Sequence, residues 1–467
     1  MFTIDDNMKK AVKWCVCLLL VAAAAMTLVY RLVNQLPSSD LPANLQVLEI
    51  FEDGGCLSCH SADPKVPFYA KLPVAGDIVM KDIESGYRAF DIEPFMEALA
   101  DDGEVSQVDL AKIEKVVLDG RMPMPKYYLV HWGSSLTDAK RAVVLSWIAE
   151  RRAEMYDDAL AGERANEPVR PIDGNVDVNE AKVALGYALY HDTRLSVDNT
   201  VSCATCHAVE TAGVDNLQYS EGVGGQKGGV NAPTVYNAVY NFVQFWDGRA
   251  KTLADQAAGP PLNPVEMASP SFDHIIAKLA KDKAFVKAFN KVYPDGLTQA
   301  NITDAIEEYE RTLITPDSRF DKWLCGDDEA ITSDELEGYG LFKTYDCATC
   351  HVGPNLGGQS YELMGLRKDY FADRGIELTN EDNGRFKETQ QERDRHRFKV
   401  PGLRNVELTW PYYHDGTRLT LEDAVRDMAI YQSGVELTDA EVSRITSFLK
   451  TLTGEYNGVP LTNDNPR

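Results

Sequence analysis

The stretch Ser202-Cys203-Ala204-Thr205-Cys206-His207 decides the organisation of this chain. The same order of a cysteine, two other residues, a second cysteine and a histidine occurs at residues 56–60 and 347–351. A random chain with 9 Cys and 8 His among 467 residues would contain about 0.003 such motifs. Three copies are therefore not accidental.

A histidine directly after the second cysteine is typical of covalent haem attachment. Two thioether bonds hold the edge of the porphyrin, and the adjacent histidine binds the iron. A disulfide or a zinc knuckle does not require this order. We therefore predict three haem c groups. Their predicted attachment cysteines are Cys56 and Cys59, Cys203 and Cys206, and Cys347 and Cys350, and their proximal ligands are His60, His207 and His351. The other cysteines, Cys15, Cys17 and Cys325, are interpreted as small apolar residues without a role in chemistry.

An apolar run at residues 14–30 precedes the first motif, and Leu32 and Val33 extend it. Its length is close to the minimum for a membrane-spanning helix. Lys9, Lys10 and Lys13 lie before it, which places the N-terminus in the cytoplasm and the haem-binding body in the periplasm. We expect a single-pass anchor in the inner membrane. A cleaved signal peptide is the alternative, because Ala22–Ala25 offers small residues for cleavage.

The length of 467 residues predicts about three domains. Polar, Pro-containing stretches at 34–45 and 165–177 are interpreted as linkers. The predicted parts are an anchor segment at 1–36, a haem domain at 37–165, a second at 166–325 and a third at 326–467, whose tail is expected to pack back on the second. The net charge of −25 argues against a nucleic-acid partner, whose phosphates would repel the chain.

Helical periodicity dominates the sequence, and no long strand pattern competes with it. Residues 138–156 and 303–313 each place apolar residues on one stripe. Thr332 with Glu335, and Thr438 with Glu441, form capping boxes ahead of two further helices. The predicted fold is mainly α, with three cytochrome c-like domains behind one N-terminal transmembrane helix.

The sixth iron ligand separates a haem that carries electrons from one that binds a substrate. Methionine in that position raises the potential, whereas an open position can bind peroxide. For the first haem we predict Met122, with Met124 as the alternative, because prolines stiffen the loop 121–125. Met428 is a candidate for the third haem, although its spacing also fits a core position. The second motif has no Met or His at a suitable distance, and Met267 is the nearest downstream, so this haem is the predicted open site.

From about residue 180 to 454 the chain resembles the bacterial di-haem cytochrome c peroxidases. The matching stretches are specific, and the anchor with an extra N-terminal haem domain is similar to the tri-haem, membrane-anchored quinol peroxidases of that family. The stretches are Asn231-Ala232-Pro233-Thr234, Phe245-Trp246-Asp247-Gly248-Arg249-Ala250, Gly259-Pro260-Pro261 with Glu266-Met267, Val400-Pro401-Gly402-Leu403-Arg404-Asn405 and Pro411-Tyr412-Tyr413-His414-Asp415-Gly416.

The resemblance implies roles for single residues. The haem on His207 would reduce peroxide, with Glu266 as the acid–base group and Gln256 orienting the substrate. Trp246 would lie between two haems and assist electron transfer. The haem on His351 would donate electrons, with Met428 as its sixth ligand. Without the resemblance, Glu266 and Trp246 fit a helix-start carboxylate and a core aromatic equally well.

The resemblance also implies one Ca²⁺ ion between domains. Its ligands would be the Asn231 side chain and the carbonyl oxygens of Thr409 and Pro411, a donor set that suits Ca²⁺. His414 would lie near that interface and tune the third haem, or serve only as a structural hydrogen-bonding residue.

One position departs from the family pattern. Where many relatives carry a histidine that closes the peroxide site in the resting enzyme, this chain has Val223, which has no lone pair to donate. Tyr219 and Lys227, on the same glycine-rich loop, are the alternative capping groups.

Three functions remain open at this point. The first is reduction of H₂O₂ to water, with electrons entering at the first haem and passing through the third to the second. The second is electron transfer without turnover. The third is oxidative maturation of a protein substrate, against which Met428 counts, because such relatives carry Tyr there. The expected electron donor is a membrane quinol, or alternatively a small c-type cytochrome attracted by the acidic surface.

Overall fold

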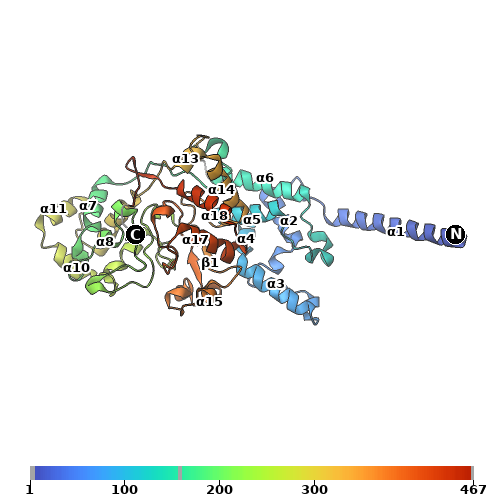
Figure 1. The fold of residues 1–467 in the computed structure, drawn as a ribbon, viewed down its shortest axis with the longest axis horizontal. Coiled ribbons are helices and arrows are strands. Elements are labelled where there is room, and N and C mark those ends of the chain that lie inside the picture. The colour runs from blue at the N-terminus through green and yellow to red at the C-terminus, as the bar shows by residue number, and fades with distance from the viewer. Residues whose placement is uncertain (1–5, 156–159, 464–467) are drawn as a thin grey trace. The chain divides into compact units, whose positions relative to one another are not determined.

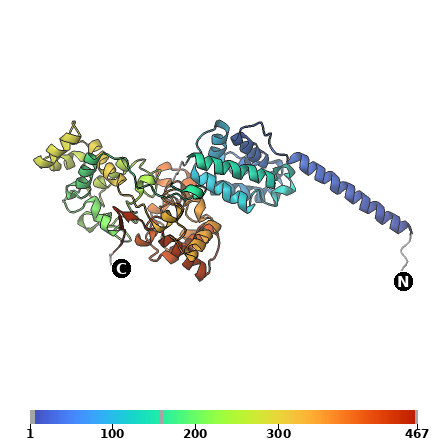
Figure 2. The ribbon, with the colours of Figure 1, turned by 90° about the horizontal axis from the view of Figure 1, so that it is seen from above.

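The computed structural model describes residues 6–155 and 160–463 of the chain. The described residues are mainly helical, as the sequence predicts, and they form two compact units, 1–151 and 152–467. Both predicted haem domains after residue 165 fall inside the second unit, so the boundary between them stays a prediction. Figure 2 shows the green-to-yellow residues of that unit gathered in one part and the orange-to-red residues in another.

The first unit opens with one long apolar helix, α1 (Asp6–Val33), which Figure 1 shows as a continuous element. Its most apolar window has a mean hydropathy of 2.3, and none of that window is buried against the protein. A helix of this length and composition can cross a membrane, although a signal sequence has the same properties.

Five further helices form the rest of the first unit around a small apolar core. Phe95 is central to that core, with its ring edge-on to Phe51 at 5.6 Å and to Trp147 at 5.9 Å. The helices are α2 (Ala43–Gly54), α3 (Ala75–Ala89), α4 (Glu93–Asp101), α5 (Gln107–Asp119) and α6 (Asp138–Met155). The sequence places the end of α6 at Tyr156, which lies outside the described residues.

The second unit contains twelve α-helices and two small two-stranded antiparallel sheets among its described residues. The helices are α7 (Glu180–Tyr190), α8 (Cys203–Cys206), α9 (Leu253–Ala257), α10 (Phe272–Leu279), α11 (Lys283–Val292), α12 (Gln299–Arg311), α13 (Arg319–Leu324), α14 (Ser333–Thr344), α15 (Tyr370–Arg374), α16 (Phe386–Thr389), α17 (Leu421–Met428) and α18 (Asp439–Lys450). One sheet pairs β1 (Tyr361–Leu363) with β2 (Arg397–Lys399), and the other is a hairpin of β3 (Glu455–Tyr456) and β4 (Val459–Pro460).

Two closely packed helix pairs frame the second and third motifs. α7 packs on α12, and α14 packs on α18. In each pair a glycine permits the close approach: a Cβ at Gly186 would collide with the Ala305 carbonyl, and a Cβ at Gly338 with the Arg444 carbonyl. The predicted capping boxes at Thr332 and Thr438 are confirmed at the starts of α14 and α18.

The C-terminal hairpin lies against the part of the unit that carries the second motif. Tyr456 contacts the ring of Tyr236 at 5.3 Å, and Leu461 packs on the same apolar cluster. Asn463 donates from its side chain to the Asn216 amide oxygen at 2.7 Å. These contacts tie the end of the chain to the segment that follows His207.

Candidate functional site

The three Cys-x-x-Cys-His motifs lie in short helical turns that share one hydrogen-bond pattern. In each, Nδ1 of the histidine lies within hydrogen-bond distance of a backbone carbonyl oxygen. The pairs are His60 with Phe90 at 2.9 Å, His207 with Gly213 at 3.4 Å and His351 with Leu356 at 2.9 Å. A carbonyl only accepts, so Nδ1 carries the proton and Nε2 keeps its lone pair for a metal. Nε2 of each histidine is therefore the nitrogen left free to bind a metal.

Close backbone packing surrounds the first motif. A Cβ at Gly86 of α3 would lie 2.7 Å from the Cys59 carbonyl oxygen, and a Cβ at Gly55 would collide with the Tyr127 hydroxyl. Met122 and Met124 are both half-buried in the loop after α5. Because their exposure is similar, burial does not distinguish the two thioethers as sixth ligands, and Met122 stays the predicted one.

Around the third motif, Met428 is the last residue of α17, where the helix widens into a π-helical turn at Ala429–Ser433. Such turns re-aim side chains and occur frequently at functional sites. The Lys399 side chain is buried nearby in β2, and among the described residues it has no anionic partner. Burial lowers the pKa of its ammonium group to about 8. An unpaired buried cation is costly, so a haem propionate is the kind of group this lysine fits.

The second motif has a different surrounding. Met267, the nearest methionine in sequence after this motif, is 3% exposed and packs in the apolar cluster that contains Val223, Leu195 and Phe272. It is a core residue. The peptide N–H of Val223 donates to the Glu266 carbonyl at 2.8 Å, and a Cβ at Gly222 would collide with the Val265 carbonyl. The glycine-rich loop is thus docked on the segment that carries Glu266.

The two alternative capping groups lie in polar surroundings. Tyr219 lies among the charges of Asp415, Asp382 and Arg374, and Lys227 is exposed on the surface.

Glu266 is positioned by a series of tight turns after α9. The peptide N–H of Gly259 donates to the Gln256 carbonyl, and the N–H of Asn263 donates to the Gly259 carbonyl. Asn263 then donates from Nδ2 to Glu266 Oε1 at 2.6 Å. Burial raises the pKa of the Glu266 carboxyl, opposed by the positive charge of Arg249 and by the Asn263 hydrogen bond. Gln256 makes no side-chain hydrogen bond among the described residues, so its amide is available to a ligand.

Asn263 and Arg249 were not singled out from the sequence. The signal for Asn263 was its position three residues before Glu266 in a Pro-rich turn, and Arg249 belongs to one of the quoted family stretches.

Trp246 lies at the junction between the second and third motif segments. Its indole N–H donates to the Asn231 carbonyl at 2.9 Å, and its own carbonyl accepts from the Lys399 peptide N–H at 2.8 Å. The His414 ring is edge-on to it at 6.3 Å. These contacts place Trp246 among the predicted calcium and electron-transfer residues.

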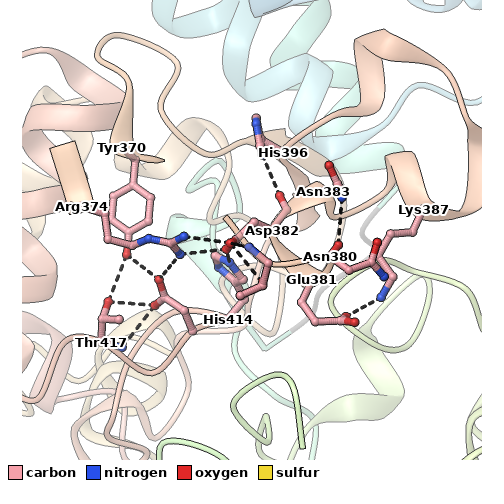
Figure 3. Close-up of polar contacts among 12 residues, drawn as sticks. Tyr370, Arg374, Asn380, Glu381, Asp382, Asn383, Lys387, His396, His414 and Thr417 are labelled. Atoms are coloured by element: carbon pink, nitrogen blue, oxygen red, sulfur yellow. Dashed lines mark hydrogen bonds and ion pairs between the residues drawn. The ribbon is translucent and has the colours of Figure 1, made fainter. Parts of the chain in front are cut away.

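His414 belongs to a buried charge network that the sequence did not reveal (Figure 3). His414 Nε2 donates to Asp382 at 2.8 Å, and Arg374 donates to Asp382 at 2.8 Å and to Asp415 at 2.7 Å. Although burial opposes the charged form, the Arg374 and His414 hydrogen bonds hold the pKa of Asp382 well below its usual value. The guanidinium already supplies the positive charge between the two carboxylates, so this cluster is an ion-pair network and not a metal site.

The predicted calcium ligands are collected around one segment, Asn216-Leu217. Asn216 donates from its side chain to the Trp410 carbonyl at 2.6 Å, and Asn231 donates from its side chain to the Leu217 carbonyl at 2.9 Å. In the described part of the chain, the carbonyl oxygens of Thr409 and Pro411 and the amide oxygen of Asn231 accept no hydrogen bond. Three oxygens without donors suit a hard cation such as Ca²⁺.

Glu310 is a second buried carboxylic acid near the second motif, and sequence reasoning missed it. It is 5% exposed in α12, and one of its oxygens has no hydrogen-bond partner among the described residues. Burial, followed by the charge of Glu307, raises its pKa from the usual 4.5 to about 8. The acid is therefore neutral inside the folded protein at neutral pH.

We expect Glu310→Gln to remove a pH dependence of stability. A raised folded-state pKa contributes stability that is complete below pH 4.5 and is lost as pH rises through about 8. In wild type, ionisation of Glu310 should lower the free energy of unfolding by up to about 1.4 kcal/mol for each pH unit within that window. Urea unfolding of the holoprotein from pH 5 to 9 measures it, with the exposed Glu329→Gln as the control. Parallel stability curves for Glu310→Gln and wild type would contradict the assignment.

The Cys-x-x-Cys-His motifs, with the half-buried Glu266 near the second of them, are the features expected of a haem peroxidase of the di-haem cytochrome c type. Residues 180–329 match the family model described as di-haem cytochrome c peroxidase, and residues 19–150 match a haem-binding domain. The chain is 51% identical over 420 residues to the cytochrome c peroxidase Ccp of Escherichia coli (strain K12), covering 90% of each protein. It is 46% identical over 338 residues to the cytochrome c551 peroxidase of Nitrosomonas europaea, covering 70% of this chain and 98% of that one.

A solved structure shares this fold. A MauG-like protein associated with microbial copper homeostasis superposes with a TM-score of 0.54 at 27% identity, covering 61% of this chain and 93% of that one. The chain therefore belongs to the di-haem cytochrome c peroxidase family, and it is an oxidoreductase that acts on hydrogen peroxide.

Proposed function

We propose that this protein is a tri-haem quinol peroxidase, anchored in the inner membrane with its haem domains in the periplasm. The observation that carries the proposal is the shared geometry of three motifs, each with a histidine whose Nδ1 lies beside a carbonyl and whose Nε2 is left for iron. The exposed apolar helix α1 supports the anchor. The reaction is H₂O₂ + 2 e⁻ + 2 H⁺ → 2 H₂O.

Each motif would hold one haem c, attached through its two cysteines. His60 with Met122 would bind the iron of the first haem, His351 with Met428 would bind that of the third, and His207 alone would bind that of the second. Haem at the second motif would supply the iron at which peroxide binds and is reduced. Electrons would enter through the first motif and pass by the third to the second, with Trp246 between the last two.

The remaining steps belong to the side chains near the second motif. Glu266 in its carboxylate form accepts a proton from one peroxide oxygen and returns it to the other, which is the task of a general acid–base group. Its raised pKa eases that exchange near neutral pH, and Asn263 holds the carboxyl in one orientation. Gln256 would orient the peroxide by hydrogen bonding. Asn231, Thr409 and Pro411 would hold Ca²⁺, and because Trp246 hydrogen-bonds Asn231, the ion would help to keep this junction rigid.

Family membership favours peroxidase turnover over the two alternative functions, because the 51% and 46% identical relatives are both peroxidases by name. A small c-type cytochrome remains the alternative electron donor.

The electron donor is tested with the full-length holoprotein in detergent. We expect peroxide consumption with a short-chain quinol to exceed consumption with a reduced small c-type cytochrome, at three haems per chain. A variant lacking residues 1–33, exported with a cleavable signal, should keep turnover with an artificial soluble donor and lose turnover with quinol in membranes. Turnover with the cytochrome alone, or two haems per chain, would contradict the proposal.

A further inference from the structure

In the first unit, His131 lies between two tyrosines. Its ring stacks on Tyr127 at 3.9 Å with an interplanar angle of 14°, and Nδ1 lies 3.2 Å from the Tyr127 carbonyl oxygen. The Tyr69 hydroxyl lies 3.3 Å from Nε2. Because the carbonyl accepts, Nδ1 is the protonated nitrogen, and Nε2 accepts from the hydroxyl. His131 thus presents Nε2 to the Tyr69 hydroxyl.

This pair is connected to the first haem motif. The Tyr127 hydroxyl hydrogen-bonds the side chain of Ser58, which lies between the two attachment cysteines. The same hydroxyl occupies the space beside Gly55, where a Cβ would collide with it. Tyr69 and Tyr127 both lie near Cys59. A molecule bound at His131 would therefore lie close to the first haem motif and could transfer electrons to it.

The pair is also connected to the base of α1. Asn34, the residue after the helix, is 8% exposed and donates from its side chain to the Trp132 carbonyl at 2.7 Å. Its amide oxygen accepts from the Ser135 peptide N–H at 3.0 Å. The segment that carries His131 is therefore fastened to the point where the apolar helix ends.

The surface around the pair is apolar and exposed. Large apolar side chains on the segments next to Tyr69 and His131 face away from the protein, which is costly in water and favourable against lipid. They are Phe68 at 80% exposure, Val74 at 72%, Val130 at 62%, Leu72 at 52% and Trp132 at 46%. A hydrophobic molecule dissolved in the membrane can reach His131 across such a surface.

We propose that Tyr69 and His131 form the binding and oxidation site for a membrane quinol. The inference rests on the proposed quinol donor and adds the site at which it acts. One quinol hydroxyl displaces the Tyr69 hydroxyl from His131 Nε2, which accepts the quinol proton as that O–H bond breaks, and the second proton passes to water. Two electrons leave for the haem held by Cys56, Cys59 and His60, so that quinol plus H₂O₂ gives quinone plus two waters.

His131→Phe tests the site, because phenylalanine keeps the stack on Tyr127 and removes the basic nitrogen. We expect kcat/KM for a short-chain quinol to fall about 10²-fold, the lower range for a positioned proton acceptor. Turnover with an artificial soluble donor and the haem spectrum should stay unchanged. Equilibrium dialysis of the holoprotein against a quinone analogue should show about tenfold weaker binding, the worth of about one hydrogen bond. Tyr69→Phe should show a smaller loss in the same direction. The matched control is the exposed His274→Phe, which should leave all readouts unchanged.

The outcomes separate the site from the donor. If wild type uses and binds quinol and His131→Phe does so equally well, the site is wrong and the donor stands. If wild type neither uses nor binds quinol, the donor is wrong and the site falls with it. If His131→Phe loses turnover with both donors and its haem spectrum changes, His131 is a structural residue of the first haem loop, and the proposal is overturned.

Discussion

Glu266→Gln should lower the rate of peroxide reduction by about 10²–10⁴-fold, the usual contribution of a positioned acid–base group. Glutamine has nearly the same shape, and its amide oxygen can still accept the hydrogen bond that Asn263 donates to Glu266 Oε1 at 2.6 Å. The substitution removes only the titratable proton carrier. Stopped-flow mixing of the holoprotein with peroxide measures the effect, and haem content should equal that of wild type.

The pH dependence of peroxide reduction provides a second test of the role of Glu266. Burial raises the pKa of Glu266, and the carboxylate is the form that accepts the first proton. In wild type the rate should therefore rise with pH through a pKa above the usual 4.5, and this limb should disappear in Glu266→Gln. Glu221→Gln, an exposed carboxylate on the neighbouring loop, is the matched control. A near-normal rate in Glu266→Gln would return Glu266 to a structural role.

The fully oxidised enzyme should react with peroxide without prior reduction, because Val223 offers no ligand to close the second haem site. The family resemblance implies that a histidine at this position closes the site in the resting enzyme, and release of that ligand would be a redox-coupled loop switch. Here the loop is fixed by the bond from the Val223 N–H to the Glu266 carbonyl at 2.8 Å and by the 4% exposure of the Val223 side chain. We expect one high-spin ferric haem among three in the oxidised holoprotein.

Val223→His should introduce the missing switch. A histidine bond that favours the closed form by about 1.4 kcal/mol would lower the initial rate of the oxidised enzyme about tenfold and restore it after partial reduction. Val223→Leu, which adds bulk without a lone pair, should react like wild type. Three low-spin haems in the oxidised wild type, or a lag before its reaction, would show that another group caps the second haem.

The charge network around Arg374 lies beside Trp246 and Asn231. His414 contacts Trp246, and its backbone carbonyl accepts from the Asn231 N–H at 2.8 Å. One buried guanidinium therefore links the loop after α15 to the segment that carries the proposed calcium ligands. Removal of one partner from such a network leaves an uncompensated buried charge, which explains why Arg374, Asp382 and Asp415 occur together.

The sequence by itself determined the haem chemistry, the membrane-type helix and the helical class. These features are local: a five-residue motif, a run of apolar residues and capping boxes at Thr332 and Thr438 each act within a few residues of chain. The stretches that resemble the family added Glu266 and Trp246, because each of these residues lies in a characteristic run of sequence.

Only the tertiary structure decided which charged groups are buried, because nothing in the neighbouring sequence indicates their burial. Glu310 and Lys399 look like ordinary charged residues in the sequence, yet each is buried and each has a pKa of about 8. Arg374 reaches Asp415 across 41 residues of chain, and Asn34 reaches Trp132 across 98. Electrostatic and hydrogen-bond energies depend on distance and burial, which are properties of the folded chain. Residues far apart in sequence therefore acquire their partners, and their shifted pKa values, only when the fold brings them together.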